Sequence, residues 1–183
     1  MGAAFSRRFA DDGAHVVVND VNEAAAGAVA DEISGEAAIF DVADSKSFDA
    51  AIDRVVAHHG RIDVLINNAG IIQPFVKINE LKLEDAAHVM NVNFTGPLML
   101  VKAFLPGLLK RSEAHILNVS SMGAYAPVPG QSVYGASKAA LKLFTEGLRS
   151  ELLDTYVGVT IVFPGAIATN IAQNSGMALP ANA

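Results

Sequence analysis

The chain has 183 residues, of which 51% are hydrophobic and 17% charged, and it carries a net charge of −6 and no cysteine. This composition predicts a compact globular chain, organised as a single domain over residues 1–183, and argues against disorder. The acidic balance argues against nucleic-acid partners, because such binding depends largely on clustered Lys and Arg. The lack of cysteine excludes disulfides and thiolate metal sites but leaves the compartment open, so cytoplasm is the default expectation.

No membrane span is expected from the sequence. The most apolar stretch, Phe94 to Leu109, is interrupted by glycine, proline and lysine before it reaches the length of about 18 residues that a span requires. The first residues do match an acylation pattern, with Met1-Gly2 followed by Ser6, which leaves a lipid anchor on Gly2 as an alternative.

Hydrophobic periodicity predicts strands and helices that alternate along the chain. Phe5 and Phe9 lie one helical turn apart and are expected to form a buried helix face. The expected elements in chain order are a helix at Ala3 to Asp12, a strand at Ala14 to Asn19, a helix at Asn22 to Ile33, a strand at Glu36 to Phe40, a helix capped by Asp44 or Ser45 and closing at Gly60, a strand at Ile62 to Ile66, a long helix with an irregular middle at Leu83 to Arg111, a strand at Ala114 to Val119, a helix carrying Tyr134 and Lys138 as far as about Asp154, and a strand at Val157 to Phe163.

This alternation predicts an α/β fold, a Rossmann-like doubly wound parallel sheet with helices on both faces. Ligands of such sheets bind beyond the carboxyl ends of the strands. Several polar or glycine-containing segments follow an expected strand directly and should line that edge: Asp20, Asp41, Asn67 to Gly70, Ser121, and Pro164-Gly165.

The segment from Ser121 to Lys138 carries residues suited to proton transfer. Tyr134 and Lys138 are spaced i, i+4, so on a helix both side chains emerge from one face. A fixed positive charge favours the phenolate form of a tyrosine, whose ordinary pKa is about 10, and so suits acid/base work near neutral pH. The hydroxyl of Ser121 could hold the reacting oxygen.

Taken together, these residues resemble the short-chain dehydrogenase/reductase family. The resemblance covers nearly the whole chain and implies an NAD(P)-dependent oxidoreductase that interconverts an alcohol and a carbonyl compound, usually as a homodimer or homotetramer. It rests on Asn67-Asn68-Ala69-Gly70, Asn93, Ser121, Tyr134-x-x-x-Lys138, and Pro164-Gly165-x-x-x-Thr169.

The resemblance also implies a role for each residue. Tyr134 would be the general acid/base, Lys138 would lower its pKa and hold the nicotinamide ribose, Ser121 would position the substrate oxygen, and Asn93 would support a proton relay. Asp20 would bind the adenosine ribose, and a carboxylate there would repel a 2′-phosphate, so the resemblance favours NAD over NADP. The remaining implied cofactor contacts are Gly2, Asp41, Val42, Asn67, Asn68, Ala69, Gly70, Pro164, Gly165, Ile167 and Thr169.

The front of the chain departs from the family pattern. Family members begin with a strand and a glycine-rich turn that cradles the pyrophosphate, and here only Gly2 stands where the last glycine would be. The usual last strand is not expected either, so the chain is interpreted as an incomplete NAD(P)-binding domain of a truncated or misdelimited dehydrogenase. The alternative is a catalytically silent fragment or interaction module that accepts a strand from a partner.

Several residues have a structural interpretation as an alternative to a functional one. Asp20 could begin a turn or cap a helix, and Asn93 could be a buried polar residue at a helix irregularity. His58 and His59 are interpreted as helix-terminal residues, and no metal is expected. Five residues are candidates to face substrate: Gln73, Met122, Val128, Gln131 and Asn170.

Overall fold

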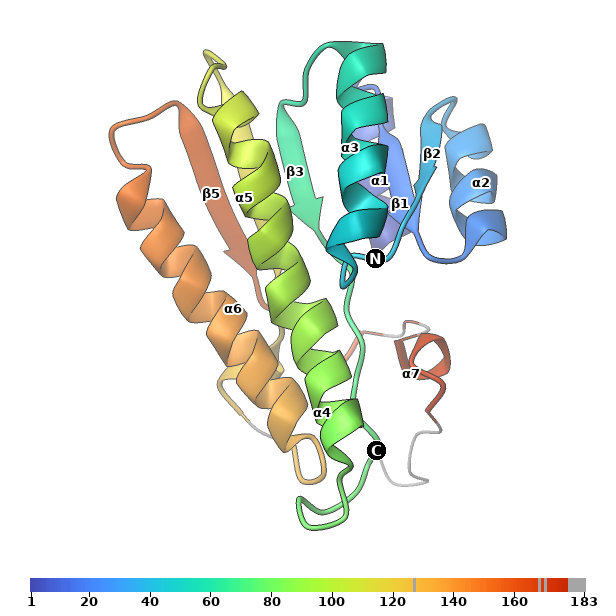
Figure 1. The fold of residues 1–183 in the computed structure, drawn as a ribbon, viewed down its shortest axis with the longest axis vertical. Helices are drawn as coiled ribbons and strands as arrows, with labels where there is room; N and C mark the ends of the chain where they lie inside the picture. The colour runs from blue at the N-terminus through green and yellow to red at the C-terminus, as the bar shows by residue number, and fades with distance from the viewer. Residues whose placement is uncertain (127, 168, 170, 178–183) are drawn as a thin grey trace. The chain divides into compact units, whose positions relative to one another are not determined.

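The computed structural model describes residues 1–183 apart from residues 127, 168, 170 and 178–183 (Figure 1). Parallel strands alternate with helices along the chain, which confirms the predicted α/β class. Two compact units are distinguished by their internal contacts, Met1–Ile62 and Asp63–Ala183. No helix in the described part of the chain has the length and apolar character that a membrane crossing demands.

The first unit contains a hydrogen-bonded pair of short parallel strands, and helices precede, connect and follow these strands along the chain. Strand β1 pairs with β2 so that Val17 is opposite Glu36 and Asp20 is opposite Ile39. Helix α2 contacts both strands and α3 contacts β2. The elements are α1 (Gly2–Asp11), β1 (Val17–Asp20), α2 (Glu23–Glu32), β2 (Glu36–Ile39) and α3 (Ser45–His59).

Local side-chain chemistry sets the ends of two of these helices. The Asn22 side chain accepts a hydrogen bond from the Ala25 amide at 3.0 Å and caps α2. Asp44 caps α3 through the Lys46 amide at 3.0 Å, as expected from the sequence. Helix α3 ends at Gly60, whose φ of 72° is the left-handed conformation that glycine adopts without a steric penalty.

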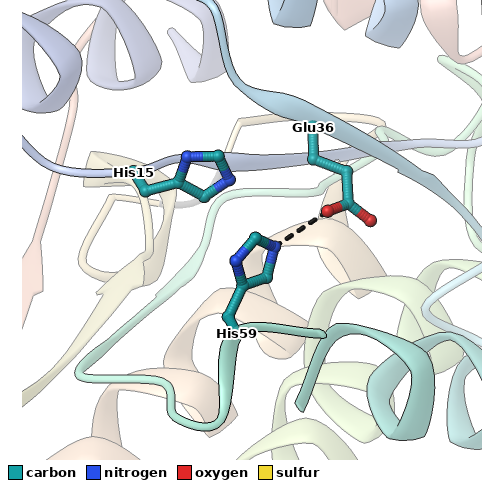
Figure 2. A group of neighbouring side chains, drawn as sticks. All are labelled: His15, Glu36 and His59. Atoms are coloured by element: carbon teal, nitrogen blue, oxygen red, sulfur yellow. Dashed lines mark hydrogen bonds and ion pairs between the residues drawn. The ribbon is translucent and has the colours of Figure 1, made fainter. Parts of the chain in front are cut away.

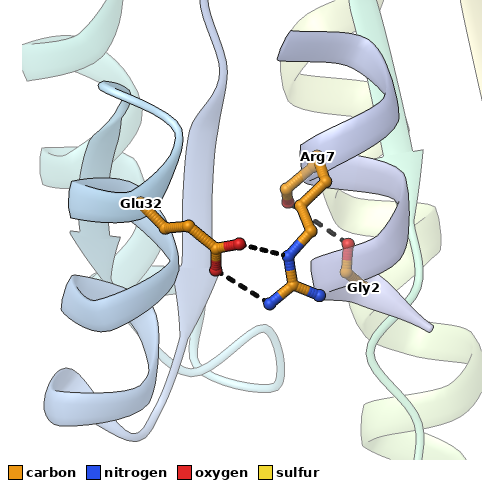
Figure 3. Close-up of polar contacts among 4 residues, drawn as sticks. Gly2, Arg7 and Glu32 are labelled. Carbon is orange, nitrogen blue, oxygen red and sulfur yellow. Dashed lines mark hydrogen bonds and ion pairs between the residues drawn. The ribbon is translucent and has the colours of Figure 1, made fainter. Parts of the chain in front are cut away.

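Helix α1 is less buried than its sequence predicts. No residue of α1 is buried, so the expected buried face of Phe5 and Phe9 is wrong, and both side chains are half-buried. The helix is tied to α2 by an exposed fork in which Arg7 Nε and Nη2 donate to the two Glu32 carboxylate oxygens at 2.7 and 2.8 Å (Figure 3). Periodicity sets which side of a helix is apolar, whereas burial depends on a packing neighbour that periodicity does not supply.

The second unit contains a three-stranded parallel sheet in the order β3-β4-β5. Helix α5 contacts β3 and β4, α6 contacts β5, and Figure 1 shows both helices on the same face of the sheet. The elements are β3 (Val64–Asn67), α4 (Leu83–Met90), a π-helical segment (Asn91–Thr95), α5 (Gly96–Leu108), β4 (Ala114–Val119), a 3₁₀ turn (Met122–Ala124), α6 (Ser132–Glu151), β5 (Val157–Val162) and α7 (Ile171–Asn174).

The irregular middle expected for the long helix is confirmed as the π-helical segment between α4 and α5. Such segments insert one residue into a helix and are frequent at functional sites. Here the segment contains Asn93, which is fully buried. The core of the unit includes Leu108, Ile116 and Leu141, each exposed by 1% or less. Packing of α5 and α6 on the sheet therefore holds an amide side chain at a fixed place.

Candidate active site

Three segments that follow strands meet at the carboxyl edge of the second unit's sheet. Asn67 ends β3 and residues 68–70 follow it, Ser121 follows β4, and Pro164 follows β5. The Met122 amide donates to the Pro164 carbonyl at 3.0 Å, and the Ser120 amide donates to Val162 at 2.9 Å, so the last two segments are joined by their backbones. This arrangement agrees with the rule that ligands bind at the carboxyl ends of parallel strands.

Helix α6 begins at this edge and is capped by a side chain from another segment. The Oε1 atom of Gln73 accepts hydrogen bonds from the amides of Val133 and Tyr134 at 2.7 and 3.0 Å. Gln131 Nε2 donates to the Gln73 carbonyl at 2.7 Å. These bonds satisfy amides that a helix start leaves unpaired and fix the first turn, which carries Tyr134.

Tyr134 and Ser121 both lie next to Gly123. A Cβ atom built on Gly123 would lie 3.1 Å from Tyr134 Cε1 and 3.4 Å from Ser121 Oγ. Ser121 Oγ accepts a hydrogen bond from the Gly123 amide at 3.0 Å, which leaves its own hydrogen free to donate. The Ser121 hydroxyl and the Tyr134 ring therefore lie near the same point, and a side chain at residue 123 would crowd both.

Lys138 lies one turn further along α6 with only 3% of its surface exposed. Its Nζ atom donates to the Val119 carbonyl at 3.0 Å, at the end of β4. Burial lowers the pKa of the Lys138 ammonium from its ordinary 10.5 to about 8. A Cβ atom built on Gly70 would lie 3.2 Å from this Nζ, so the absence of a side chain at residue 70 makes room for the ammonium group.

Asn93 connects the turn after β3 to α6. Its Oδ1 accepts from the Ile71 amide and its Nδ2 donates to the Ile71 carbonyl, both at 2.9 Å. Nδ2 also donates to Ser137 Oγ at 3.0 Å, and Ser137 Oγ donates to the Tyr134 carbonyl at 2.7 Å. These contacts fit the alternative interpretation of Asn93 as a buried polar residue at a helix irregularity. Nothing in the sequence pattern singled out Ser137, because a serine inside a helix has no distinctive spacing.

Two asparagine oxygens at the same edge have no protein partner within the described residues. Asn67 Nδ2 donates to Asn118 Oδ1 at 2.8 Å, and Asn118 Nδ2 donates to Thr145 Oγ1 at 2.9 Å. This chain of bonds orients Asn67 but leaves its Oδ1 buried and unpaired, and Asn68 Oδ1 is also buried and unpaired. Buried unpaired acceptors are rare and mark a place where a ligand or water donates.

The other residues implied by the family pattern lie in different settings. In the first unit, Asp20 ends β1, is exposed, and accepts from the Asn22 amide at 3.0 Å, which is the geometry of a turn. Asp41 Oδ1 accepts from the Ala43 amide at 2.9 Å, and Val42 is 7% exposed. Gly2 begins α1. In the second unit, Ala69, Gly165 and Ile167 are exposed, whereas Pro164 and Thr169 are half-buried.

Two of the five residues expected to face substrate are buried. Gln73 and Gln131 are 1% and 4% exposed and hold the start of α6. Gln73 Oε1 is paired with two backbone amides, so the expectation is wrong for Gln73. Gln131 Oε1 is buried without a hydrogen-bond partner among the described residues, so the expectation stays a prediction for Gln131. Met122 and Val128 are 48% and 52% exposed. Asn170 lies outside the described residues.

Comparisons with known proteins identify the family of the chain. The family described as short chain dehydrogenase matches residues 1–179. A probable oxidoreductase EphD of Mycobacterium tuberculosis is 38% identical over 98% of this chain, and the match covers 31% of EphD. The chain therefore spans about a third of the length of that curated relative.

Solved structures with bound cofactor are also similar. A metagenomic short-chain oxidoreductase in complex with NADP has a TM-score of 0.84 and 33% identity, over 91% of this chain and 76% of the other. The 3-ketoacyl-(acyl-carrier-protein) reductase of Brucella melitensis, complexed with NADH, has a TM-score of 0.86 and 31% identity, over 90% and 72% of the two chains.

The chain belongs to the short-chain dehydrogenase family. Its fold is that of the family's NAD(P)-binding Rossmann domain, represented here by the parallel strands and helices described above. The similar structures bind NADP in one case and NADH in the other, so a nicotinamide cofactor is supported and the choice between the two is left open.

Proposed function

We propose that the chain contributes the catalytic part of an NAD-dependent oxidoreductase that interconverts a secondary alcohol and a ketone. The observation that carries this proposal is the grouping at the start of α6, where Tyr134 and Ser121 both lie next to Gly123, and the buried Lys138 lies next to Gly70. A phenol, a hydroxyl and an ammonium group placed close together can hold one substrate oxygen and exchange its proton.

Each residue would have a distinct task. The Tyr134 hydroxyl takes the proton of the alcohol or gives it back to the ketone oxygen. Ser121 Oγ, already accepting from the Gly123 amide, donates its hydrogen to the same substrate oxygen and positions it. With a pKa of about 8, Lys138 holds a positive charge near neutral pH that favours negative charge on the substrate oxygen or the phenol.

The residues at the carboxyl edge fit a nicotinamide cofactor. The unpaired Oδ1 atoms of Asn67 and Asn68 offer buried acceptors, and Gly70 leaves space beside Lys138. We assign the nicotinamide side to residues of the second unit: Asn67, Asn68, Ala69, Gly70, Lys138, Pro164, Gly165, Ile167 and Thr169. The adenosine contacts that the family pattern implies, Asp20, Asp41 and Val42, belong to the first unit and stay predictions. The bound cofactor would accept or supply the hydride at the carbinol carbon. A carboxylate at residue 20 favours NAD over NADP, since it repels a 2′-phosphate.

Exposed leucines support an oligomer of the proposed enzyme. Leu83 on α4, Leu98 on α5 and Leu143 on α6 are 83%, 36% and 70% exposed. A homodimer or homotetramer that packs these helices together would cover them. The molar mass of the 183-residue chain in solution, from light scattering after size exclusion, tests this assignment, and a monomer would contradict it. A cytoplasmic location stays a prediction.

The test of the function begins with cofactor binding. We expect saturable NADH binding to the purified chain, measured by calorimetry, that is weakened by Asp20→Ala. A panel of secondary alcohols and ketones then identifies substrates, and Tyr134→Phe should lower kcat by at least about 100-fold. Tyr156→Phe, at an exposed residue, is the matched control. If a folded wild-type chain does not bind NADH, the proposal fails and the silent-module alternative stands.

A further inference from the structure

We propose that the first unit contains a binding site for a divalent transition-metal ion, formed by His15, Glu36 and His59. One ligand atom from each of these side chains lies within 4.8 Å of the others. Figure 2 shows the three side chains converging from three segments: the turn before β1, the first residue of β2 and the last residue of α3. They are far apart in sequence, so spacing alone gave no reason to expect them together.

The backbone holds these segments firmly. The Glu36 amide donates to the Val16 carbonyl at 3.0 Å, directly after His15, and Val17 is paired with Glu36 in the sheet. Gly35 fits closely here, since a Cβ atom built on it would lie 2.5 Å from the Val16 carbonyl oxygen. His59 ends α3 just before Gly60, whose left-handed conformation stops the helix. Three ligands carried by fixed backbone form a prearranged site.

The donor set selects the kind of ion. Two imidazoles and one carboxylate, without thiolates, suit zinc and its first-row neighbours better than magnesium or calcium, which prefer oxygen ligands. Three protein ligands are the usual number at zinc sites that keep one position for water. In tetrahedral geometry with bonds of 2.0–2.1 Å the ligand atoms lie roughly 3.3 Å apart, so the three side chains, whose ligand atoms are now within 4.8 Å of one another, would have to draw closer around the ion.

Groups of both signs surround the cluster. His59 Nε2 and Glu36 Oε2 are 2.8 Å apart and share a hydrogen bond, and the proton between them is the one that a metal ion would displace. The carboxyl end of α3 carries the negative pole of the helix dipole. Arg54 acts in the opposite direction, because its positive charge lowers the pKa of the Glu36 carboxyl.

The site lies at the amino ends of β1 and β2, whereas Asp20 is at the carboxyl end of β1. Its role is therefore structural: the ion joins the starts of both strands to the end of α3. This inference does not depend on the proposed function, because all three ligands lie in the first unit and none of the proposed catalytic residues does.

The experiment is calorimetric titration of Zn²⁺ into the full 183-residue chain, prepared without a polyhistidine tag and treated with chelator. We expect one zinc per chain with a dissociation constant in the micromolar range or lower. His15→Ala and Glu36→Gln should each weaken binding at least about tenfold, and His88→Ala, at an exposed histidine of α4, should leave it unchanged. Mg²⁺ in excess should not compete.

Two further measurements guard against variants that misfold. Circular dichroism checks that each variant retains the wild-type spectrum. Zinc should raise the thermal midpoint of the wild type and of His88→Ala but not that of Glu36→Gln, because only an ion bound to the folded state stabilises it. No saturable binding, or binding equally strong in folded Glu36→Gln, would overturn the proposal and leave a hydrogen-bonded His59 and Glu36 pair.

Discussion

Lys138→Met should make the stability of the chain less dependent on pH. Lys138 is 3% exposed, and burial lowers its pKa from 10.5 to about 8. Between these two values the unfolded chain binds a proton that the folded chain does not, so stability rises with pH across this window. The folded state therefore carries a penalty below about pH 8 that is relieved as the pH approaches 10.5.

The size of the change in stability follows from the shift in the Lys138 pKa. A difference of about 2.5 pKa units corresponds to about 3 kcal/mol in total, of which about 2 kcal/mol is recovered between pH 7 and pH 9.5. Methionine has a similar length and no charge, so the variant lacks this recovery. The free energy of unfolding of wild type minus that of Lys138→Met should therefore increase by about 2 kcal/mol from pH 7 to pH 9.5.

Urea unfolding followed by circular dichroism at both pH values measures this difference. Lys102→Met, at an exposed lysine of α5, is the matched control and should show no such trend relative to wild type. A difference for Lys138→Met that stays constant within about 0.5 kcal/mol would refute the reasoning and mean that the ammonium keeps its hydration in the folded chain.

Three further predictions concern the backbone and its supports. Asn93→Ala removes three hydrogen bonds of a buried side chain and should lower the free energy of unfolding by roughly 2–4 kcal/mol in urea titrations. A loss below about 1 kcal/mol would contradict the network. Gln73→Ala uncaps α6 and should cost about 1–2 kcal/mol in the same assay, whereas the exposed Gln173→Ala should be neutral. In the first unit, Gly35→Ala places a Cβ atom 2.5 Å from a carbonyl oxygen and should destabilise the chain by about 1–3 kcal/mol. Gly27→Ala, with open space around it in α2, should stabilise the chain by about 0.5–1 kcal/mol. Thermal unfolding that showed the same sign for both variants would count against these local environments.

The sequence by itself determined the alternation of strands and helices, because each depends on periodicity and local caps that neighbouring residues supply. Asp44 and Gly60 bound α3 as expected, and Tyr134 and Lys138 share one face of α6 because of their spacing. The residues after β3, β4 and β5 were likewise expected at one edge, since parallel strands end on the same side of a sheet.

Only the tertiary structure decided what those residues contact. Burial of Lys138 at the end of β4, the capping of α6 by Gln73, and the exposure of α1 all depend on segments distant in sequence. The convergence of His15, Glu36 and His59 has the same origin, since strand pairing and a helix end bring together three separate segments. Periodicity describes one element at a time, whereas the desolvation and hydrogen bonding that set chemistry arise between elements.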